Sequence, residues 1–265
     1  MSATNTAQHF GWVTKSFHWL TALLILAAIV LGVVANGAAY ETSDQIAQKS
    51  WLFSFHKTIG LAAFFAALFR VLWAFTQKRP GKIGTTAWEN WLADVAHWAL
   101  YASMIFVPLA GWVTHAASSG YAPIWWPFGQ DLPLVPKSPA LSVAAGQVHM
   151  AWEKILLVSI ILHVAGAVKH HVIDKDATLR RMLPGQPKVT VHPKQATLIP
   201  PIVAAVIFGG VAFVAAAQAD LDAPGSQVTL AQPVASDWVI QDGTVAITVT
   251  QFGSAVPGAF ADWTA

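Results

Sequence analysis

Five apolar segments, each about 20 residues long, constrain the fold of this chain more than any other feature, because a helix that crosses a bilayer needs a run of about that length. They cover residues 17–36, 52–76, 92–116, 147–170 and 199–218. The 265 residues are 55% hydrophobic and only 11% charged, which lies outside the range of ordinary soluble domains. The sequence therefore predicts an all-α membrane protein in contact with lipids.

The basic residues predict the orientation of these spans. Lys and Arg gather at residue 15, between residues 70 and 82, and between residues 169 and 194, and fewer lie in the other segments. Cytoplasmic loops carry an excess of Lys and Arg, so we expect the N-terminus and the loops after the second and fourth spans in the cytoplasm. The first span is longer than the apolar part of a secretory signal and is expected to remain as an anchor. The C-terminal tail then lies outside, across the membrane.

Two histidines, His149 and His163, lie fourteen residues apart in the fourth span. Fourteen helical residues make nearly four turns and rise about 21 Å, so both imidazoles face the same way at opposite depths of the membrane. His18 and His56 each stand near the start of another span. In an antiparallel bundle of the first four spans, His18 meets His163 toward the cytoplasm. His56 then meets His149 toward the outside. An ionisable side chain inside hydrocarbon is costly, which makes these four histidines a functional hypothesis.

Each pair can hold one haem iron between two neutral imidazole nitrogens. The chain has no cysteine, which excludes thiolate-held iron–sulfur clusters and the covalent attachment of c-type haem. Any haem is therefore held non-covalently, through histidine, and with both axial positions filled it passes single electrons. Two such sites give an electron path across most of the bilayer.

Two other interpretations of the histidines stay open. Any one histidine can simply form a hydrogen bond between helices, although four at matched depths argue against this. Histidine also binds Zn and Cu, so the four can line a metal-transport pathway. Such a pathway normally recruits carboxylates or Met as well, and the candidate near the pairs is Glu153.

Three further residues of the second span are candidate cofactor contacts. Lys57 and Arg70 can pair with the anionic haem propionates near the two membrane surfaces. Gly60, one turn after His56, lets a flat macrocycle come close to the backbone. Each has an ordinary alternative, because cations snorkel at membrane interfaces and glycine is frequent in membrane helices.

Six of the ten histidines lie outside the two pairs, and four of these are in the apolar spans or next to them. For His97, a hydrogen bond between helices competes with a quinone or propionate contact. His115 is expected near the outer surface, where it can exchange protons with a quinone headgroup. His170 and His171 follow the fourth span beside Lys169 and are expected at the membrane interface.

The chain beyond the fourth span differs in kind. Its Pro and Gly residues predict a cytoplasmic linker over residues 186–198. The fifth span, 199–218, has neither charge nor histidine and is expected to be an anchor outside the electron path. Residues 219–265 contain five Asp and no Lys or Arg, and alternation over residues 244–249 predicts strands. No basic stripe with interleaved aromatic residues is present in the sequence, so nucleic-acid binding is not expected.

At the histidines and their neighbours the chain resembles the bacterial cytochrome b561 family of four-helix, di-haem membrane proteins. The likeness covers about residues 8–185 and is carried by short motifs. These are Phe17-His18-Trp19, His56-Lys57-x-x-Gly60, the aromatic-rich stretch 70–75, His149-x-x-x-Glu153, Leu162-His163, His170-His171 and the closing segment 175–185. The resemblance implies a four-helix transmembrane bundle that holds two b haems within residues 1–185. It implies as axial ligands His18, His56, His149 and His163.

The same resemblance implies electron exchange between the quinone pool, with ubiquinone as the expected substrate, and a periplasmic donor or acceptor. In one branch of the family the donor is superoxide, and membership of that branch would make this chain a superoxide:quinone oxidoreductase. The reverse direction, from quinol to a periplasmic acceptor, would use the same ligands. Two alternatives remain, namely the histidine-lined metal transporter and a cytochrome subunit that anchors a separate dehydrogenase. A homodimer is also considered.

The tail resembles the opening strands of the YceI-like family of lipocalin-type barrels. The similar stretches are residues 238–240, 251–253 and 256–260. They correspond only to the first part of such a barrel. The resemblance therefore implies a short β-like periplasmic tail over residues 219–265, with quinone or isoprenoid handling at the outer surface as the function that such a fusion suggests.

Overall fold

The computed structural model describes residues 2–84, 86–118, 121–192, 197–222, 245–251 and 254–260. They belong to two compact units, residues 1–223 and residues 224–265. The first unit is helical and contains every candidate site residue.

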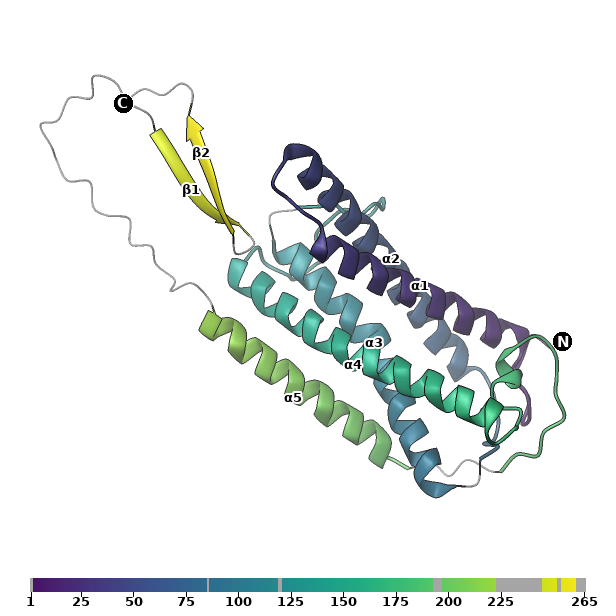
Figure 1. The fold of residues 1–265 in the computed structure, drawn as a ribbon. Coiled ribbons are helices and arrows are strands. Elements are labelled where there is room, and N and C mark those ends of the chain that lie inside the picture. Colours follow the sequence, from purple (N-terminus) through teal and green to yellow (C-terminus); the bar gives the residue numbers. More distant parts are fainter. Residues whose placement is uncertain are drawn as a thin grey trace, which may run out of the picture. The chain divides into compact units, whose positions relative to one another are not determined.

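Five long helices form the first unit (Figure 1). They are α1 (Trp12–Gly37), α2 (Ser43–Phe75), α3 (Ala87–Ala117), α4 (Pro139–Val172) and α5 (Ile199–Asp222), with a single 3₁₀ turn, η1 (Arg180–Met182), between α4 and α5. All five are long and apolar enough to cross a membrane. The predicted all-α membrane fold with five spans is therefore confirmed.

The helices are antiparallel neighbours in sequence order. Backbone contacts are most extensive between α1 and α2 and between α3 and α4, and α5 lies against α3 and α4. Large apolar side chains such as Leu23, Val30 and Val33 of α1 are exposed. Because these side chains lie on a membrane-spanning helix, their exposure fits contact with lipid tails rather than with water.

The apolar runs locate the helices but not their ends. α2 begins at Ser43, well before its apolar run, because Thr42 and Gln45 form a capping box. α4 begins at Pro139, since the Ser138 side chain accepts a hydrogen bond from the Leu141 N–H. Hydropathy marks the hydrocarbon layer, whereas the helices continue into the polar interface.

The first helix starts differently from the sequence prediction. The first apolar run begins at residue 17, whereas α1 begins at Trp12 with Gly11 as its N-cap. The Lys15 N–H already donates to the Gly11 carbonyl at 3.1 Å. Ser16 therefore lies inside the helix.

One end of the unit, here called the N-terminal end, joins the start of α1 to residues 76–84 and 173–192. The Lys15 ammonium is buried and donates to the carbonyls of Leu183 at 2.7 Å and Gly185 at 2.9 Å. Lys82 and His192 form an antiparallel backbone bridge, so part of the expected linker is paired with the segment after α2. These three segments thus share one side of the bundle.

The opposite end, here called the loop end, is covered by residues 121–138. The Trp125 N–H donates to the Thr58 hydroxyl at 3.0 Å, and its indole stacks on Phe55 with ring centres 5.8 Å apart. Lys137 donates to the carbonyls of Ala116 and Ser118. The loop is therefore fixed to the middle of α2 and to the C-terminal end of α3.

The fifth helix is held to the bundle by an aromatic contact. Trp152 of α4 donates its indole N–H to the Phe208 carbonyl at 3.0 Å. The rings of Phe106 and Phe208 lie 5.7 Å and 5.6 Å from that of Trp152. α5 thus packs on the outside of α3 and α4.

The second unit contains a hairpin of β1 (Val245–Gln251) and β2 (Ser254–Phe260). The strands pair antiparallel from Val245 with Phe260 to Gln251 with Ser254. The strand prediction over residues 244–249 is confirmed from residue 245 onward. Two strands do not test the resemblance to a lipocalin-type barrel, which stays a prediction, and its stretches 238–240 and 252–253 lie outside the described residues.

Candidate functional site

One candidate ligand pair lies toward the loop end, where His56 of α2 faces His149 of α4. Their ring centres are 6.1 Å apart and the ring planes are nearly perpendicular, at 88°. Nδ1 of His56 lies 2.8 Å from the Ala28 carbonyl oxygen, and Nδ1 of His149 lies 2.8 Å from that of Val107. A carbonyl can only accept, so each Nδ1 carries the proton and each Nε2 keeps a lone pair for a metal.

A second pair lies toward the N-terminal end, where His18 of α1 faces His163 of α4. Their ring centres are also 6.1 Å apart, with the planes at 55°. Trp19 lies edge-on to His18 at 5.2 Å, and His97 lies edge-on to His163 at 5.1 Å. The sequence left His97 outside both pairs, and the structure places it against His163 of this pair.

The spacing of both pairs fits an iron ion held between two imidazoles. Two metal–nitrogen bonds of about 2 Å each, together with the radius of about 1 Å of each imidazole ring, separate the ring centres by about 6 Å. The observed separation is 6.1 Å in both pairs. The donor set, two neutral imidazoles per site, also suits haem iron. The residues present therefore fit two bis-histidine haems.

Two glycines beside the loop-end pair were missed by the sequence analysis. A Cβ at Gly32 of α1 would lie 2.9 Å from Cε1 of His56, and a Cβ at Gly111 of α3 would lie 3.0 Å from Cε1 of His149. The predicted Gly60 differs, because a Cβ there would meet no described atom within 4 Å. Nothing in the sequence distinguishes Gly32 and Gly111 from the other glycines, because each glycine and the histidine that it contacts are far apart in the chain.

Lys57 anchors the loop. Its ammonium donates to the carbonyls of Tyr121 at 2.7 Å and Ala122 at 2.9 Å, and lies 3.2 Å from Nδ1 of His115. His115 is buried, and its Nε2 lies 3.0 Å from Oε1 of Gln130. An ammonium has three N–H donors, so these partners can occupy all of them. The structure thus shows loop anchoring, and the propionate contact of Lys57 stays a prediction.

Arg70 of α2 lies near the His18–His163 pair, toward the N-terminal end of the unit. Its Nη1 is 3.9 Å from the Met104 sulfur, and its charge is near enough to act on both His18 and His163. Thioether sulfur is a weak acceptor. A guanidinium with so weak a partner suits an anionic group at this depth, as predicted for a propionate.

A polar cluster covers the last turn of α4, at the N-terminal end of the unit. Glu89, His170 and Asp174 place ligand atoms within 4.8 Å of one another, a geometry that a cation could use. The Lys169 ammonium, however, lies 2.9 Å from both Glu89 and Asp174. Because this ammonium already pairs with both carboxylates, the cluster gives little support to a metal-transport pathway.

His170 also contacts Asp176 in the segment after α4. Nδ1 of His170 lies 2.7 Å from the Asp176 carboxylate, which accepts a further hydrogen bond from the Thr178 N–H at 2.7 Å. Partial burial acts to raise the pKa of Asp176, but the hydrogen bonds from Thr178 and His170 outweigh it and leave this pKa below its ordinary value. The carboxylate thus stabilises the chain as it leaves the fourth span.

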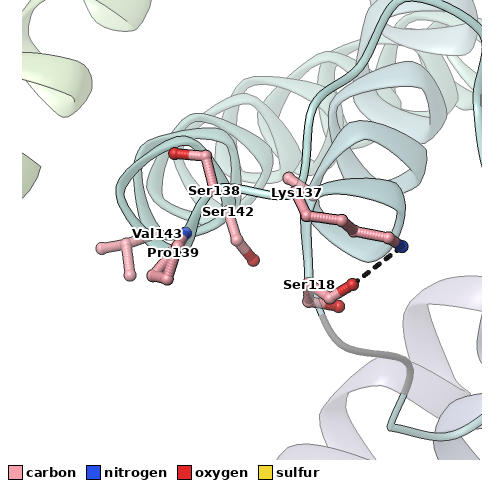
Figure 2. A pocket seen from close by; sticks show the side chains of 7 residues that line it. Ser118, Lys137, Ser138, Pro139, Ser142 and Val143 are labelled. Carbon is pink, nitrogen blue, oxygen red and sulfur yellow. Dashed lines mark hydrogen bonds between the residues drawn. The ribbon is translucent and has the colours of Figure 1, made fainter.

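A recess of about 540 Å³ opens at the loop end beside the start of α4 (Figure 2). It is lined by Ala117, Ser118, Lys137, Ser138, Pro139, Ser142 and Val143. The Lys137 ammonium turns to the Ser118 carbonyl at 3.0 Å, and the Ser142 hydroxyl donates to the Thr114 carbonyl at 2.9 Å. These polar groups are already used within the protein, and none of the lining residues belongs to the histidine pairs.

The fold and the site together define a class, a multi-pass membrane protein with a pair of facing imidazoles at each of two depths. The chain belongs to the prokaryotic cytochrome b561 family, whose sequence model matches residues 9–185. The predicted family is thus confirmed. The match ends before α5 and the tail, which lie outside it.

Curated relatives agree with this assignment. The chain is 30% identical to cytochrome b561 homolog 2 of Escherichia coli (strain K12) over 190 residues, which are 69% of this chain and 95% of the relative. It is 32% identical to cytochrome b561 homolog 1 of the same strain over 99 residues, 37% of this chain and 54% of the relative. It is 26% identical to a probable superoxide oxidase CybB of Yersinia pestis over 170 residues, 63% of this chain and 91% of the relative. The chain is therefore a membrane cytochrome that transfers electrons across the membrane.

Proposed function

We propose that this protein carries single electrons between the quinone pool and a redox partner on the opposite side of the membrane, through two haems b. His56 and His149 hold the loop-end haem, and His18 and His163 hold the N-terminal-end haem. The observation that carries the proposal is the ring separation of 6.1 Å in both pairs, the value expected for two imidazoles on one metal.

The protein residues set where the electrons travel. His149 and His163 share one face of α4 and stand about 21 Å apart along its axis. Haem b, when bound, supplies reversible one-electron chemistry. With two imidazole nitrogens on each iron, the histidines would leave no coordination position for oxygen. The Nδ1–H bonds of His56 and His149 fix the tautomer that a ligand needs.

Three residues of α2 complete the proposed cofactor sites. Gly60 leaves open space one turn after His56, where a macrocycle can approach the backbone. Arg70 offers a guanidinium to a propionate of the N-terminal-end haem. Lys57 is proposed to attract a propionate of the loop-end haem by its positive charge, in addition to holding the loop.

Ubiquinone is the proposed quinone, and superoxide is a candidate electron donor. The second suggestion comes from the relative in Yersinia pestis, which is named a probable superoxide oxidase. The protein is proposed to lie in a bacterial inner membrane, with the N-terminal end in the cytoplasm and the loop end and tail in the periplasm. The excess of Lys and Arg at the N-terminal end supports this orientation.

Selective loss of haems tests the ligand assignment. His56→Ala and His149→Ala should each remove the loop-end haem from the reduced-minus-oxidised spectrum, and His18→Ala and His163→Ala the other. His115→Ala is the control, because His115 lies outside both pairs. If His56→Ala and His18→Ala removed the same spectral component, the pairing would be wrong. Colourless wild-type protein from haem-replete cells that instead binds Zn or Cu would favour the metal transporter.

A further inference from the structure

The two loop-end histidines form the same kind of hydrogen bond to a neighbouring helix. His56 of α2 reaches the Ala28 carbonyl of α1, and His149 of α4 reaches the Val107 carbonyl of α3, both at 2.8 Å. Each of these carbonyls lies within a helix, where its oxygen also serves the backbone N–H four residues later. A carbonyl oxygen has two lone pairs, so it can accept both hydrogen bonds.

The residue four positions after each carbonyl is a glycine. Gly32 follows Ala28, and Gly111 follows Val107. A Cβ at Gly32 would lie 2.9 Å from Cε1 and 3.0 Å from Nδ1 of the facing imidazole, and at Gly111 both distances would be 3.0 Å. These distances are shorter than nearly all real Cβ contacts, so a methyl group at either position would force the ring or the helix to shift.

Helix geometry explains why glycine stands there. Side chains of an α-helix lean toward its N-terminus and cover the preceding turn. A side chain at position i+4 therefore screens the carbonyl of residue i from a group on a neighbouring helix, and glycine leaves it open. We propose that Gly32 and Gly111 are positioning residues, which hold His56 and His149 in the orientation that serves the loop-end haem.

This proposal rests on the proposed function, because it concerns the ligands of one haem. A hydrogen bond from Nδ1–H to a carbonyl makes the imidazole a more basic ligand. A more basic ligand favours oxidised iron and lowers the reduction potential. The glycines also permit the ring planes to stand at 88°, and the angle between axial imidazoles governs the anisotropy of the electron paramagnetic resonance signal of low-spin ferric haem.

The test uses the full-length purified protein and the variants Gly32→Ala and Gly111→Ala. Redox titration followed by visible spectra should show a higher potential for the loop-end haem in both, about tenfold in its equilibrium constant or about 59 mV for one electron. The ferric signal of that haem should also move, while the other haem keeps both properties. Gly37→Ala is the matched control, since a Cβ at Gly37 of α1 would meet no described atom within 4 Å.

A second pair of variants separates the ring contact from a general folding defect. If Gly32→Ala lowers yield or thermal stability through the imidazole of His56, the same change should have no effect in a His56→Ala background. An equal loss in that background would overturn the proposal. So would wild-type values for both the potential and the ferric signal in Gly32→Ala and Gly111→Ala. Wild-type protein without a loop-end haem would instead refute the proposed function.

Discussion

Gly60 allows the packing of haem to be measured apart from the packing of the protein. A Cβ at this position would meet no described protein atom within 4 Å, and Ala is favoured over Gly in a helix interior by about 0.8–1 kcal/mol. Gly60→Ala should therefore fold at least as well as the wild type before haem is added. If a macrocycle lies against this backbone, the new methyl group overpacks the contact at a cost of about 1–3 kcal/mol. Haem affinity at the loop-end site should then fall about 5-fold to 150-fold.

The assay is a titration of haem into the haem-free protein, followed by its visible absorption, alongside thermal unfolding of the same haem-free samples. Gly37→Ala, on α1, controls for the effect of an added methyl group on a membrane helix. Wild-type haem affinity at both sites in Gly60→Ala would refute the macrocycle contact. Reduced stability of the haem-free variant would show that Gly60 packs against protein instead.

Three further changes test the contacts that hold the loop, the segment after α4 and the helix α5. Lys57→Met should destabilise the loop of residues 121–138 by about 2–3 kcal/mol, because it removes hydrogen bonds from a charged donor. Limited proteolysis within this loop should become faster, and an unchanged rate would contradict the prediction. Asp176→Asn should lower the melting temperature at neutral pH, because the lowered pKa of Asp176 means that its ionised form stabilises the folded state. This difference should begin to shrink as the pH falls below about 4, the ordinary pKa of an aspartate, and should vanish once the pH is below the lowered pKa. A difference that persists at still lower pH would count against it. Trp152→Phe should lower the free energy of unfolding by about 1 kcal/mol, because it removes the hydrogen bond to the Phe208 carbonyl. Thermal unfolding measures this change, and an unchanged melting temperature would show that the bond adds no stability.

The helices could be predicted from the sequence because apolar length alone identifies a membrane span. Their ends could not. Thr42 and Ser138 extend α2 and α4 beyond the apolar runs through caps, which depend on a few local hydrogen bonds. The early start of α1 at Trp12 has no capping side chain, so no cap motif in the sequence marks it.

The facing of the histidines could also be predicted, because spacing along one helix and alternating direction of the spans fix depth. The fourteen residues between His149 and His163 were enough for this. The surroundings of each ring could not be predicted from the sequence, because the carbonyls that accept from Nδ1 and the glycines beside them belong to other helices. Lys57 shows the same limit, because its neighbour His56 suggested a propionate contact and the structure adds a role in holding the loop.

The most direct test of the account is a haem count on the purified protein, made together with its reduced-minus-oxidised visible spectrum. The account predicts two non-covalent haems b per chain, with b-type bands that resolve into two components on redox titration. One haem per chain would contradict the pairing of His18 with His163 or of His56 with His149. A protein without haem, from cells well supplied with it, would contradict electron transfer through the histidine pairs.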